Sequence, residues 1–451
     1  MFDHIMSDLI PFLPIATLLI LAVSTRKMAE SMIAAAAVAL LLLHRSNLVG
    51  GTLESFYETF SNDSFQFCVL IVFCFGIVIR LFQESGGLQG FAAWLRKYMK
   101  GPKSTLVFCW LLSAVLFVDE YLNALTVGFS MSGIADSNKI PREHLALQVH
   151  LMACSLCMTI PLTSWTAFTI GLIGDYGMGF SDYLKAVPLM FYPVMSVVLC
   201  LLLALGVFPK LGKLKTAYDR VCSGGPAFLE EEKETSLVDL GKPDESKIAS
   251  PIYLLLPLLT MTGGTLYFDM NLAAGMLVTI VCQFVLYVLG KRMTVSDFFQ
   301  YFFDGAGSML MINIVLFFGF ILSDANEKLG LFDTVIRLVS SSVPGAVIPV
   351  LTFFIVGFIV FASGTCWIVM LITMSIFIPL AAAAGASQIL TLAALMSGVG
   401  AGYTLCFYAD TVFMTTASTG VGNITIIQTI LPYSVIMMIL SGLGYLALGF
   451  M

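Results

Sequence analysis

The sequence predicts an all-α polytopic membrane protein, specifically an inverted-repeat transporter with two re-entrant hairpins and broken transmembrane helices. Three observations support this prediction: the composition, the length of the apolar runs, and a similarity between the two halves of the chain. Of the 451 residues, 59% are hydrophobic and only 11% are charged, and the mean hydropathy is +0.95. Soluble domains carry about 25% charged residues, so the composition excludes a soluble enzyme. The excess of Asp and Glu (28) over Lys and Arg (22) argues against a nucleic-acid partner.

The apolar residues form mixed runs near the length of about 20 residues that crosses a bilayer as a helix. They do not alternate over ten-residue segments, as the strands of an outer-membrane barrel do. In chain order, the expected apolar segments are Leu9–Val23, Met28–Leu43, Phe65–Phe82, Thr105–Gly133, His144–Asp175, Ala186–Val207, Pro251–Phe268, Leu272–Leu289, Gly307–Leu322, Ile348–Ala384, Ile389–Thr416 and Ile430–Leu448.

Four of these segments are too long for one straight span, or contain polar residues near their middles. We interpret the segments of about 105–133 and 348–384 as re-entrant hairpins. The segments of about 144–175 and 389–416 are interpreted as broken helices.

A long polar stretch, residues 209–250, separates the two halves. It is interrupted by Gly224, Gly225 and Pro226, and we interpret it as a linker with no chemistry of its own. Cytoplasmic loops of membrane proteins are enriched in Lys and Arg. One orientation places 17 of the 22 basic residues on the side of the linker. The sequence therefore predicts a multi-pass inner-membrane protein with a cytoplasmic linker and both termini outside.

The two halves, residues 1–208 and 251–451, resemble each other at a nearly constant spacing. In the orientation above, the matched spans run in opposite directions, and inverted repeats with broken helices are the architecture of secondary transporters. The alternative is a chance match between two hydrophobic stretches. The matched positions are Gly76 with Gly319, Glu84 with Glu327, 119–123 with 363–367, and 161–164 with 407–410.

Two acids, Asp119 and Glu120, lie at the expected break of the first hairpin, between apolar flanks. A charge at the centre of a membrane helix costs about 2.5–3.5 kcal/mol on insertion scales, so it is rarely found there without a partner or a function. A carboxylate can hold Na+ or a proton but not both at once, and this competition is a minimal antiport mechanism. Asn123, one turn further on, adds an amide oxygen of the kind that Na+ accepts. The alternative for the acids is a structural role, as a helix cap or an ion pair with Arg80.

The second candidate region is the sequence that interrupts the helix expected over 144–175. Pro161 has no amide donor and frees a carbonyl about one turn earlier. Thr163 and Ser164 can either bond to that backbone or coordinate an ion. Trp165 follows them and is a candidate wall for an organic substrate, although interior packing explains it equally well.

The second half offers two further candidate regions. At the expected tip of the second hairpin, Gly364 permits close approach of the backbone to a ligand, and Ser363 and Thr365 supply hydroxyls. Asp410 is the only acid within some 50 residues and is followed by Thr411. The complete set of candidate ion- or substrate-binding residues is Asp119, Glu120, Asn123, Thr163, Ser164, Trp165, Ser363, Gly364, Thr365, Asp410 and Thr411, and the Na+ candidates among them are Asp119, Asn123, Ser164, Thr365 and Asp410.

Weaker patterns have mainly structural interpretations. Arg80 and Glu84 are one turn apart and are expected to pair. The glycines of the segment 398–402 indicate a close contact between helices. His150, Cys154 and Cys157 share one helical face, but a metal site there lacks a fourth ligand.

The motifs above resemble the NhaC family of Na+/H+ antiporters over residues 65 to 435. The resemblance rests on FVDEYLNALTVG at 117–128, IPREHLA at 140–146, PLTSW at 161–165, SGTCW at 363–367 and DT at 410–411 with ASTG at 417–420. It implies a homodimer with a scaffold and a moving transport domain, and Na+-linked exchange. Two departures stand out: Glu120 replaces the family's second Asp, and TLCFYA at 404–409 replaces its polar run His-Cys-Ser-Pro-Ile-Ser.

The sequence thus predicts a secondary active transporter coupled to Na+, H+ or both, most simply a Na+/H+ antiporter. The alternative is an ion-coupled carrier of a small organic acid or amino acid, which the loss of polar residues before Asp410 favours. We expect no enzymatic activity and no cofactor besides the coupling ions. The expected partners are small ions, membrane lipids and a second copy of the chain. The substrate, the stoichiometry, the direction of transport and the choice between Asp119 and Glu120 stay open.

Overall fold

The computed structural model describes residues 10–25, 28–96, 99–229, 249–268, 271–331, 334, 343–364, 366–407 and 409–451. Within these ranges the chain is built of helices and contains no β-strand. The first half contains α2 (Leu13–Thr25), α3 (Met28–Leu43), α4 (Leu48–Ser61), α5 (Asp63–Ser85), α6 (Gly87–Arg96), α7 (Pro102–Val115), α8 (Glu120–Ser137), α9 (Arg142–Thr159), α10 (Ser164–Gly174), α11 (Phe180–Ala186), α12 (Phe191–Leu205) and α13 (Gly212–Cys222).

The second half contains α14 (Ile252–Tyr267), α15 (Leu272–Phe284), α16 (Val295–Ser308), α17 (Leu310–Lys328), α19 (Ile348–Ser363), α20 (Trp367–Ala383), α21 (Gln388–Leu405), α22 (Asp410–Thr419) and α23 (Asn423–Gly449). A π-helical segment, Val285–Leu289, continues α15, and short 3-10 turns occur at Ile10–Phe12, Val187–Leu189 and Gly345–Val347.

Helices end inside each of the four segments that the sequence marked as interrupted, which confirms the predicted fold class of an all-α transporter with broken helices. The breaks separate α7 from α8, α9 from α10, α19 from α20 and α21 from α22. The bend between α9 and α10 is 40°. Each break leaves backbone N–H and C=O groups without partners in their own helix, and such groups can bind an ion or a substrate.

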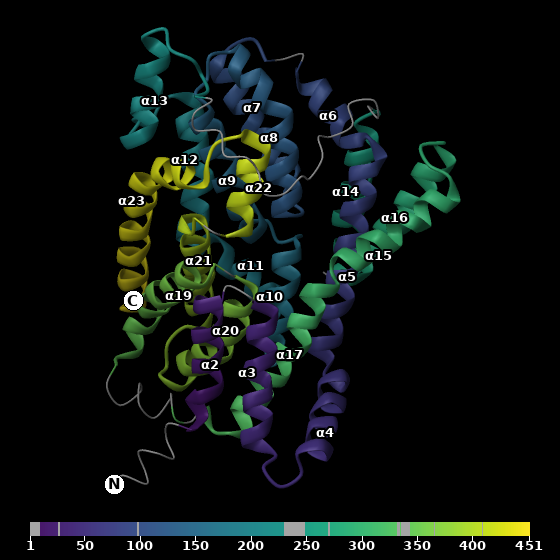
Figure 1. The fold of residues 1–451 in the computed structure, drawn as a ribbon, viewed down its shortest axis with the longest axis vertical. Helices are drawn as coiled ribbons and strands as arrows, with labels where there is room; N and C mark the ends of the chain where they lie inside the picture. The colour runs from purple at the N-terminus through teal and green to yellow at the C-terminus, as the bar shows by residue number, and fades with distance from the viewer. Residues whose placement is uncertain are drawn as a thin grey trace.

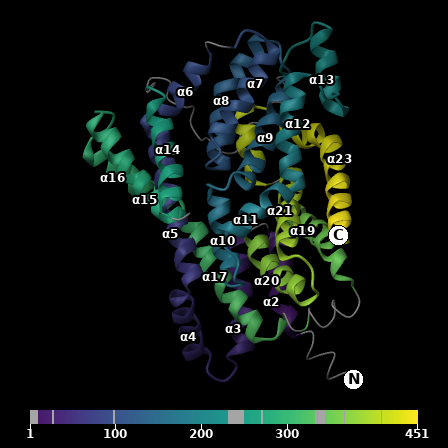
Figure 2. The ribbon, with the colours of Figure 1, turned by 180° about the vertical axis from the view of Figure 1, so that it is seen from behind.

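The two hairpins lie in opposite parts of the molecule. In Figure 1, α7 and α8 lie toward the upper end near α13, whereas α19 and α20 lie in the lower half, and Figure 2 agrees from behind. The second limb of each hairpin packs against the second part of the other half's broken helix, α8 on α22 and α20 on α10. This exchange brings the interrupted ends of both inverted repeats into one interior region.

The repeats are related at different spacings in different places. The second parts of the broken helices begin at Ser164 (α10) and Asp410 (α22), which lie at matched positions of the predicted repeat. The second limbs of the hairpins begin at Glu120 (α8) and Trp367 (α20). By these helix starts Asp119 lies level with Cys366, three residues beyond the predicted match with Ser363. Connections between helices differ in length between the repeats, and a constant offset cannot follow them.

The core is formed by α9 and α21, which are buried along nearly their whole lengths. The glycine-rich segment of α21 packs directly on α19: a Cβ at Gly398 or Gly402 would collide with the backbone around Phe353 and Gly357. The predicted close helix contact is therefore confirmed, and small residues make it possible because they let two backbones approach.

By length and composition, three helices of the described chain can cross a membrane, or up to six if each bent pair counts as one span. The three are Phe65–Ser85, Gln388–Leu405 and Asn423–Gly449. The sequence predicted more spans because it counted apolar runs regardless of helix length. It also missed α4 and α16, whose apolar residues are diluted by polar ones.

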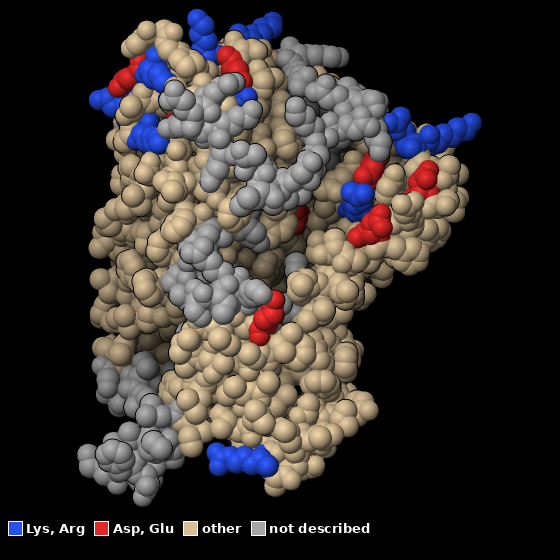
Figure 3. Space-filling view, viewed as in Figure 1, with Lys and Arg blue, Asp and Glu red and all other residues tan. Residues whose placement is uncertain are grey.

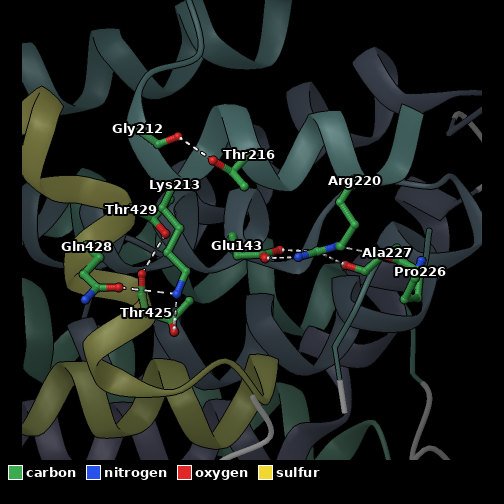
Figure 4. Close-up of polar contacts among 10 residues, drawn as sticks. All are labelled: Glu143, Gly212, Lys213, Thr216, Arg220, Pro226, Ala227, Thr425, Gln428 and Thr429. Atoms are coloured by element: carbon green, nitrogen blue, oxygen red, sulfur yellow. Dashed lines mark hydrogen bonds and ion pairs between the residues drawn. The ribbon is translucent and has the colours of Figure 1, made fainter. Parts of the chain in front are cut away.

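The described parts of the segment 209–250, which we interpreted as a linker, are residues 209–229 and 249–250, and the first of these contains a helix, α13, that the sequence analysis did not predict. Figure 4 shows how α13 joins the two halves: Arg220 forms a double contact with Glu143 of α9, at 2.8 and 3.0 Å, and Lys213 donates to Thr425 and Gln428 of α23 at 3.1 and 3.3 Å. Residues 230–248 lie outside the described chain.

Candidate functional site

A small internal cavity lies where the two repeats meet. Its volume is about 20 Å³, which accommodates about one water-sized species. Residues from both halves of the chain line it: Val72, Phe75, Ile79, Asp119, Glu120, Tyr121, Ser164, Met309 and Trp367. Three of the four predicted regions therefore reach this cavity: the first hairpin tip, the start of α10 and, through Trp367, the start of α20.

The acids of the first hairpin are deeply buried, with 6% of Asp119 and none of Glu120 exposed. Glu120 is the first residue of α8, where the positive end of the helix dipole favours a negative charge. Removing a carboxylate from water costs several kcal/mol unless a cation, a proton or hydrogen bonds compensate it. Two acids at one cavity wall form a natural site for a small cation or an exchangeable proton.

Asn123 fastens the tip of the first hairpin. Its Nδ2 donates to the carbonyls of Ser113 and Leu116, at 2.8 and 3.2 Å, so it satisfies the end of α7 from the first turn of α8. Its Oδ1 is buried and has no hydrogen-bond partner among the described residues. Asn123 does not line the cavity, but its amide holds the acids in place.

The two hydroxyls at the break between α9 and α10 have different roles. Thr163 caps α10: its Oγ1 donates to the Cys157 carbonyl at 2.5 Å and accepts from the Thr166 amide at 3.2 Å. Ser164 lines the cavity, is 8% exposed, and its Oγ has no hydrogen-bond partner among the described residues. Of the two alternatives that the sequence left open, Thr163 therefore takes the backbone role, while Ser164 presents a spare oxygen.

Aromatic rings surround the start of α10. The ring of Trp165 lies 5.3 Å from that of Trp367 and 5.7 Å from that of Tyr403, between ring centroids, and Phe168 contacts Trp367 edge-on at 4.8 Å. Trp165 is fully buried. These rings exclude water from one side of the cavity and bring the first repeat's broken helix into contact with the second repeat's hairpin.

The start of α22 lies near the tip of the first hairpin. On one face of α9, the Cys154 thiol contacts the Thr411 hydroxyl at 3.7 Å, and the Cys157 thiol contacts the Phe117 carbonyl at 3.5 Å. The two cysteines are one helical turn apart, and a turn rises about 5.4 Å. The segment that starts with Asp410 and Thr411 thus lies about one turn along α9 from the hairpin tip.

Some predicted residues lie outside what the structure describes. The side chains of Ser363 and Asp410 and all of Thr365 belong to this group. Gly364 is described, and its φ of 71° places it in the left-handed region at the end of α19. A glycine is favoured there because it has no Cβ to clash, which is a backbone reason for its presence.

The weaker expectations have structural outcomes. Arg80 pairs with Glu84 at 3.2 Å, as predicted. The His150 ring lies within 3.1 Å of the Thr404 carbonyl and 3.4 Å of the Thr415 hydroxyl. Within the described ranges, no group of three His, Cys, Asp or Glu residues could hold a metal ion.

Sequence reasoning missed the apolar wall of the cavity. Val72, Phe75 and Ile79 come from α5, and Met309 comes from the junction of α16 and α17. Their residue types carry no chemical signal. The three α5 residues recur at helical spacing, but only the packing of α5 shows which face meets the hairpin.

Comparisons with known proteins agree with this architecture. The model of a family described as the Na+/H+ antiporter family matches residues 156–450, well over half of the chain. The chain belongs to the Na+/H+ antiporter family. The match begins inside α9, so Asp119 and Glu120 of this antiporter-family protein lie before it, and their assignment depends on the geometry above.

Individual relatives are distant in sequence. An uncharacterized protein of Haemophilus influenzae is 24% identical over 478 aligned residues, covering 97% of this chain and 90% of the relative. The crystal structure of the Alcanivorax borkumensis YdaH transporter, with an unusual topology, is similar with a TM-score of 0.58 at 14% identity, covering 90% of this chain and 88% of YdaH. MtrF of Neisseria gonorrhoeae, described as illuminating a class of antimetabolite efflux pumps, is similar with a TM-score of 0.53 at 14% identity, covering 90% and 85%. These likenesses show a transporter fold for this antiporter-family protein.

Proposed function

We propose that this secondary transporter exchanges Na+ for H+ at the cavity between the repeats. The observation that supports the proposal is the meeting of Asp119, Glu120 and the spare Ser164 oxygen at a cavity sized for one small species. An organic solute needs several times this volume, whereas a dehydrated cation needs several oxygens held close together.

In the proposed mechanism, Asp119 and Glu120 carry the exchangeable cation. Na+ and a proton compete for the same carboxylate oxygens, so binding one releases the other. Ser164 supplies a neutral oxygen. Asn123 and the regions of Thr365 and Asp410 complete the predicted ligand set when the repeats move. The break at each helix end lets backbone carbonyls contribute as well.

We further propose an orientation with the linker in the cytoplasm and both termini outside, in the inner membrane. On the face drawn in Figure 3, most Lys and Arg side chains gather at the upper end of the molecule, where α13 lies, and the region below is largely uncharged. Cytoplasmic loops carry such an excess of basic residues. The repeats would be residues 1–208 and 251–451, and the functional unit a homodimer, as the family resemblance implies.

The test uses purified protein in proteoliposomes that contain a pH-sensitive dye. A Na+ pulse outside should drive proton efflux from the wild type. Asp119→Asn, Glu120→Gln and Asp410→Asn should reduce it, while Asp304→Asn, which removes an exposed carboxylate of α16, should not. Full exchange by all three site variants would reject the site assignment.

A second candidate is a Na+- or H+-coupled carrier of a small organic acid or amino acid. The contact of Trp165, Trp367 and Tyr403 beside the cavity favours it, because these rings could form a wall against a carbon skeleton once the repeats move apart. Uptake of a labelled amino acid without Na+-dependent proton movement would replace the first proposal with this one.

A further inference from the structure

A second and much larger cavity lies between α4, α10, α17 and α20. Its volume is about 840 Å³, within the range of ligand-binding clefts. Figures 1 and 2 place α4, α17 and α20 in the half of the molecule away from α13. This cavity, called here the acidic pocket, is separate from the small central cavity.

Negative charge dominates the wall of the acidic pocket. Four carboxylates line it: Glu58, Asp175, Asp324 and Glu327. Lys328 contacts two of them, Glu58 at 2.6 Å and Asp324 at 2.9 Å. The acids therefore outnumber this amine by a wide margin, and a cleft with one sign of charge concentrates ions of the opposite sign.

Two of the acids act on one pocket residue. Tyr176 lies just beyond the end of α10, and its pKa is raised by burial and by the negative charges of Asp175 and Glu327. Tyr176 is only partly exposed and lines the pocket. A side chain at position 176 therefore senses the negative electrostatic potential of the pocket.

On three helices that begin at the central cavity, the first residue to line the acidic pocket is apolar. These residues are Leu172 of α10, Phe320 of α17 and Leu371 of α20, and they are called here the apolar floor. On α20, Leu371 is one turn beyond Trp367, and on α10, Leu172 is about two turns beyond Ser164. A hydrophobic constriction at this level would stop hydrated ions until it widens.

The inner end of this route carries a polar atom that a ligand would satisfy. Ser164 is more than nine-tenths buried, lines the central cavity, and its Oγ lacks a hydrogen-bond partner among the described residues. The four acids of the pocket would not by themselves indicate a route for a cation, because such a route must end at a group that can bind the cation. Here the same helices, α10 and α20, line both the acidic pocket and the cavity with the spare oxygen.

We propose that the acidic pocket is the entrance through which small cations reach the central cavity from the face opposite α13, and that Leu172, Phe320 and Leu371 form its gate. The structure is then the state open to that face and closed at the floor. The inference deepens the proposed function, since it rests on a small cation as the species that enters.

The test measures chemical access and does not require transport. Tyr176→Cys, in a Cys222→Ser background, is treated from either side of an oriented vesicle with membrane-impermeant thiosulfonates of similar size and opposite charge. We expect modification from the side opposite α13, faster with the cationic reagent. Glu327→Gln should lower the cation-to-anion rate ratio roughly three-fold, as expected for the loss of one nearby charge in 0.1 M salt, and Asp304→Asn should leave it unchanged.

Two controls keep the proposal open to refutation. The native Cys222, exposed on α13, should react only from the other side. Ser61→Cys, on an exposed pocket residue of α4, should show the same charge preference if Tyr176→Cys does not fold. Modification only from the side of Cys222, or a ratio that Glu327→Gln leaves unmoved, would overturn the entrance. Absence of Na+/H+ exchange with the charge preference intact would instead reject antiport and retain the entrance.

Discussion

The tips of the two hairpins share a backbone design but differ in chemistry. Asp119 and Cys366 each directly precede the second limb of their hairpin, α8 and α20. The first tip places two acids in the cavity wall, whereas the residue that follows the second tip, Trp367, places an indole ring there. The comparison teaches that a duplicated fold can keep its broken helices while concentrating the charge on one side of the site.

The same positions also differ in how the hairpin is closed. Asn123 ties the first tip through two hydrogen bonds to the end of α7. Its counterpart Met370 is fully buried and apolar, and the second tip turns at Gly364, in the left-handed conformation. A polar clasp holds acids in a defined place, and a glycine turn suffices where no charge has to be positioned.

The largest expected effect is on transport, when the acids of the first hairpin tip are replaced. Glu120→Gln and Asp119→Asn should each reduce Na+-driven proton movement by roughly 100-fold or more. Each variant removes a negative charge from the bound cation, and leaving a buried charge without its opposite charge costs about 3–5 kcal/mol. Cys366→Ala, at the equivalent position of the second tip, should change it little. Proteoliposome assays measure both, and equal losses at the two tips would refute the asymmetry.

A smaller effect is expected at Asn123, whose side chain closes the first hairpin tip. Asn123→Ala leaves the Ser113 and Leu116 carbonyls without their donor and should lower the free energy of unfolding by about 1–3 kcal/mol. Met370→Leu, the counterpart control, should cost less because it conserves volume. Thermal unfolding in detergent checks the pair, and similar shifts for both variants would contradict the difference in closure.

The two hydroxyls at the break between α9 and α10 are expected to differ in role: Ser164 binds the ion and Thr163 caps α10. Ser164→Ala should raise the KM for Na+ roughly ten-fold, the equivalent of about 1.4 kcal/mol, with thermal stability unchanged. Thr163→Ala should instead lower the stability by about 1 kcal/mol, as loss of an N-cap does. If the two variants exchanged these phenotypes, the assignment of the hydroxyls would be wrong.

The smallest effect is expected at the second tip's ring. Ring contacts are worth about 0.5–1.5 kcal/mol, and Trp367→Phe keeps most of them because it keeps an aromatic ring, so it should change Na+/H+ exchange by less than roughly three-fold. A large change in apparent substrate affinity would favour the organic-solute carrier, and transport kinetics with Na+ and with labelled amino acids distinguish the two.

Much of the architecture could be predicted from local features. Pro161 and the polar residues at 119–120, 363–365 and 410–411 mark positions where an apolar helix cannot continue unchanged, and the structure breaks its helices at or beside each of them. The register between the hairpins could not be predicted, because a three-residue difference in the connections leaves no local trace. The helix α13 within the supposed linker was missed for a similar reason: it is held by Glu143, Thr425 and Gln428, which are distant in sequence.

Residue types and their order alone predicted the membrane environment, the two related halves, the broken helices and the candidate acids. These features follow from hydrophobicity, from helix-breaking residues and from the cost of a charge in lipid. Only the packed molecule decided that Ser164 faces the cavity while Thr163 caps a helix, that α5 supplies most of the apolar wall, and that acids from α4, α17 and the residue after α10 share one pocket. The physical reason is that these facts depend on which faces of distant helices meet, and a side chain's neighbours across a helix contact are not encoded in its own neighbourhood along the chain.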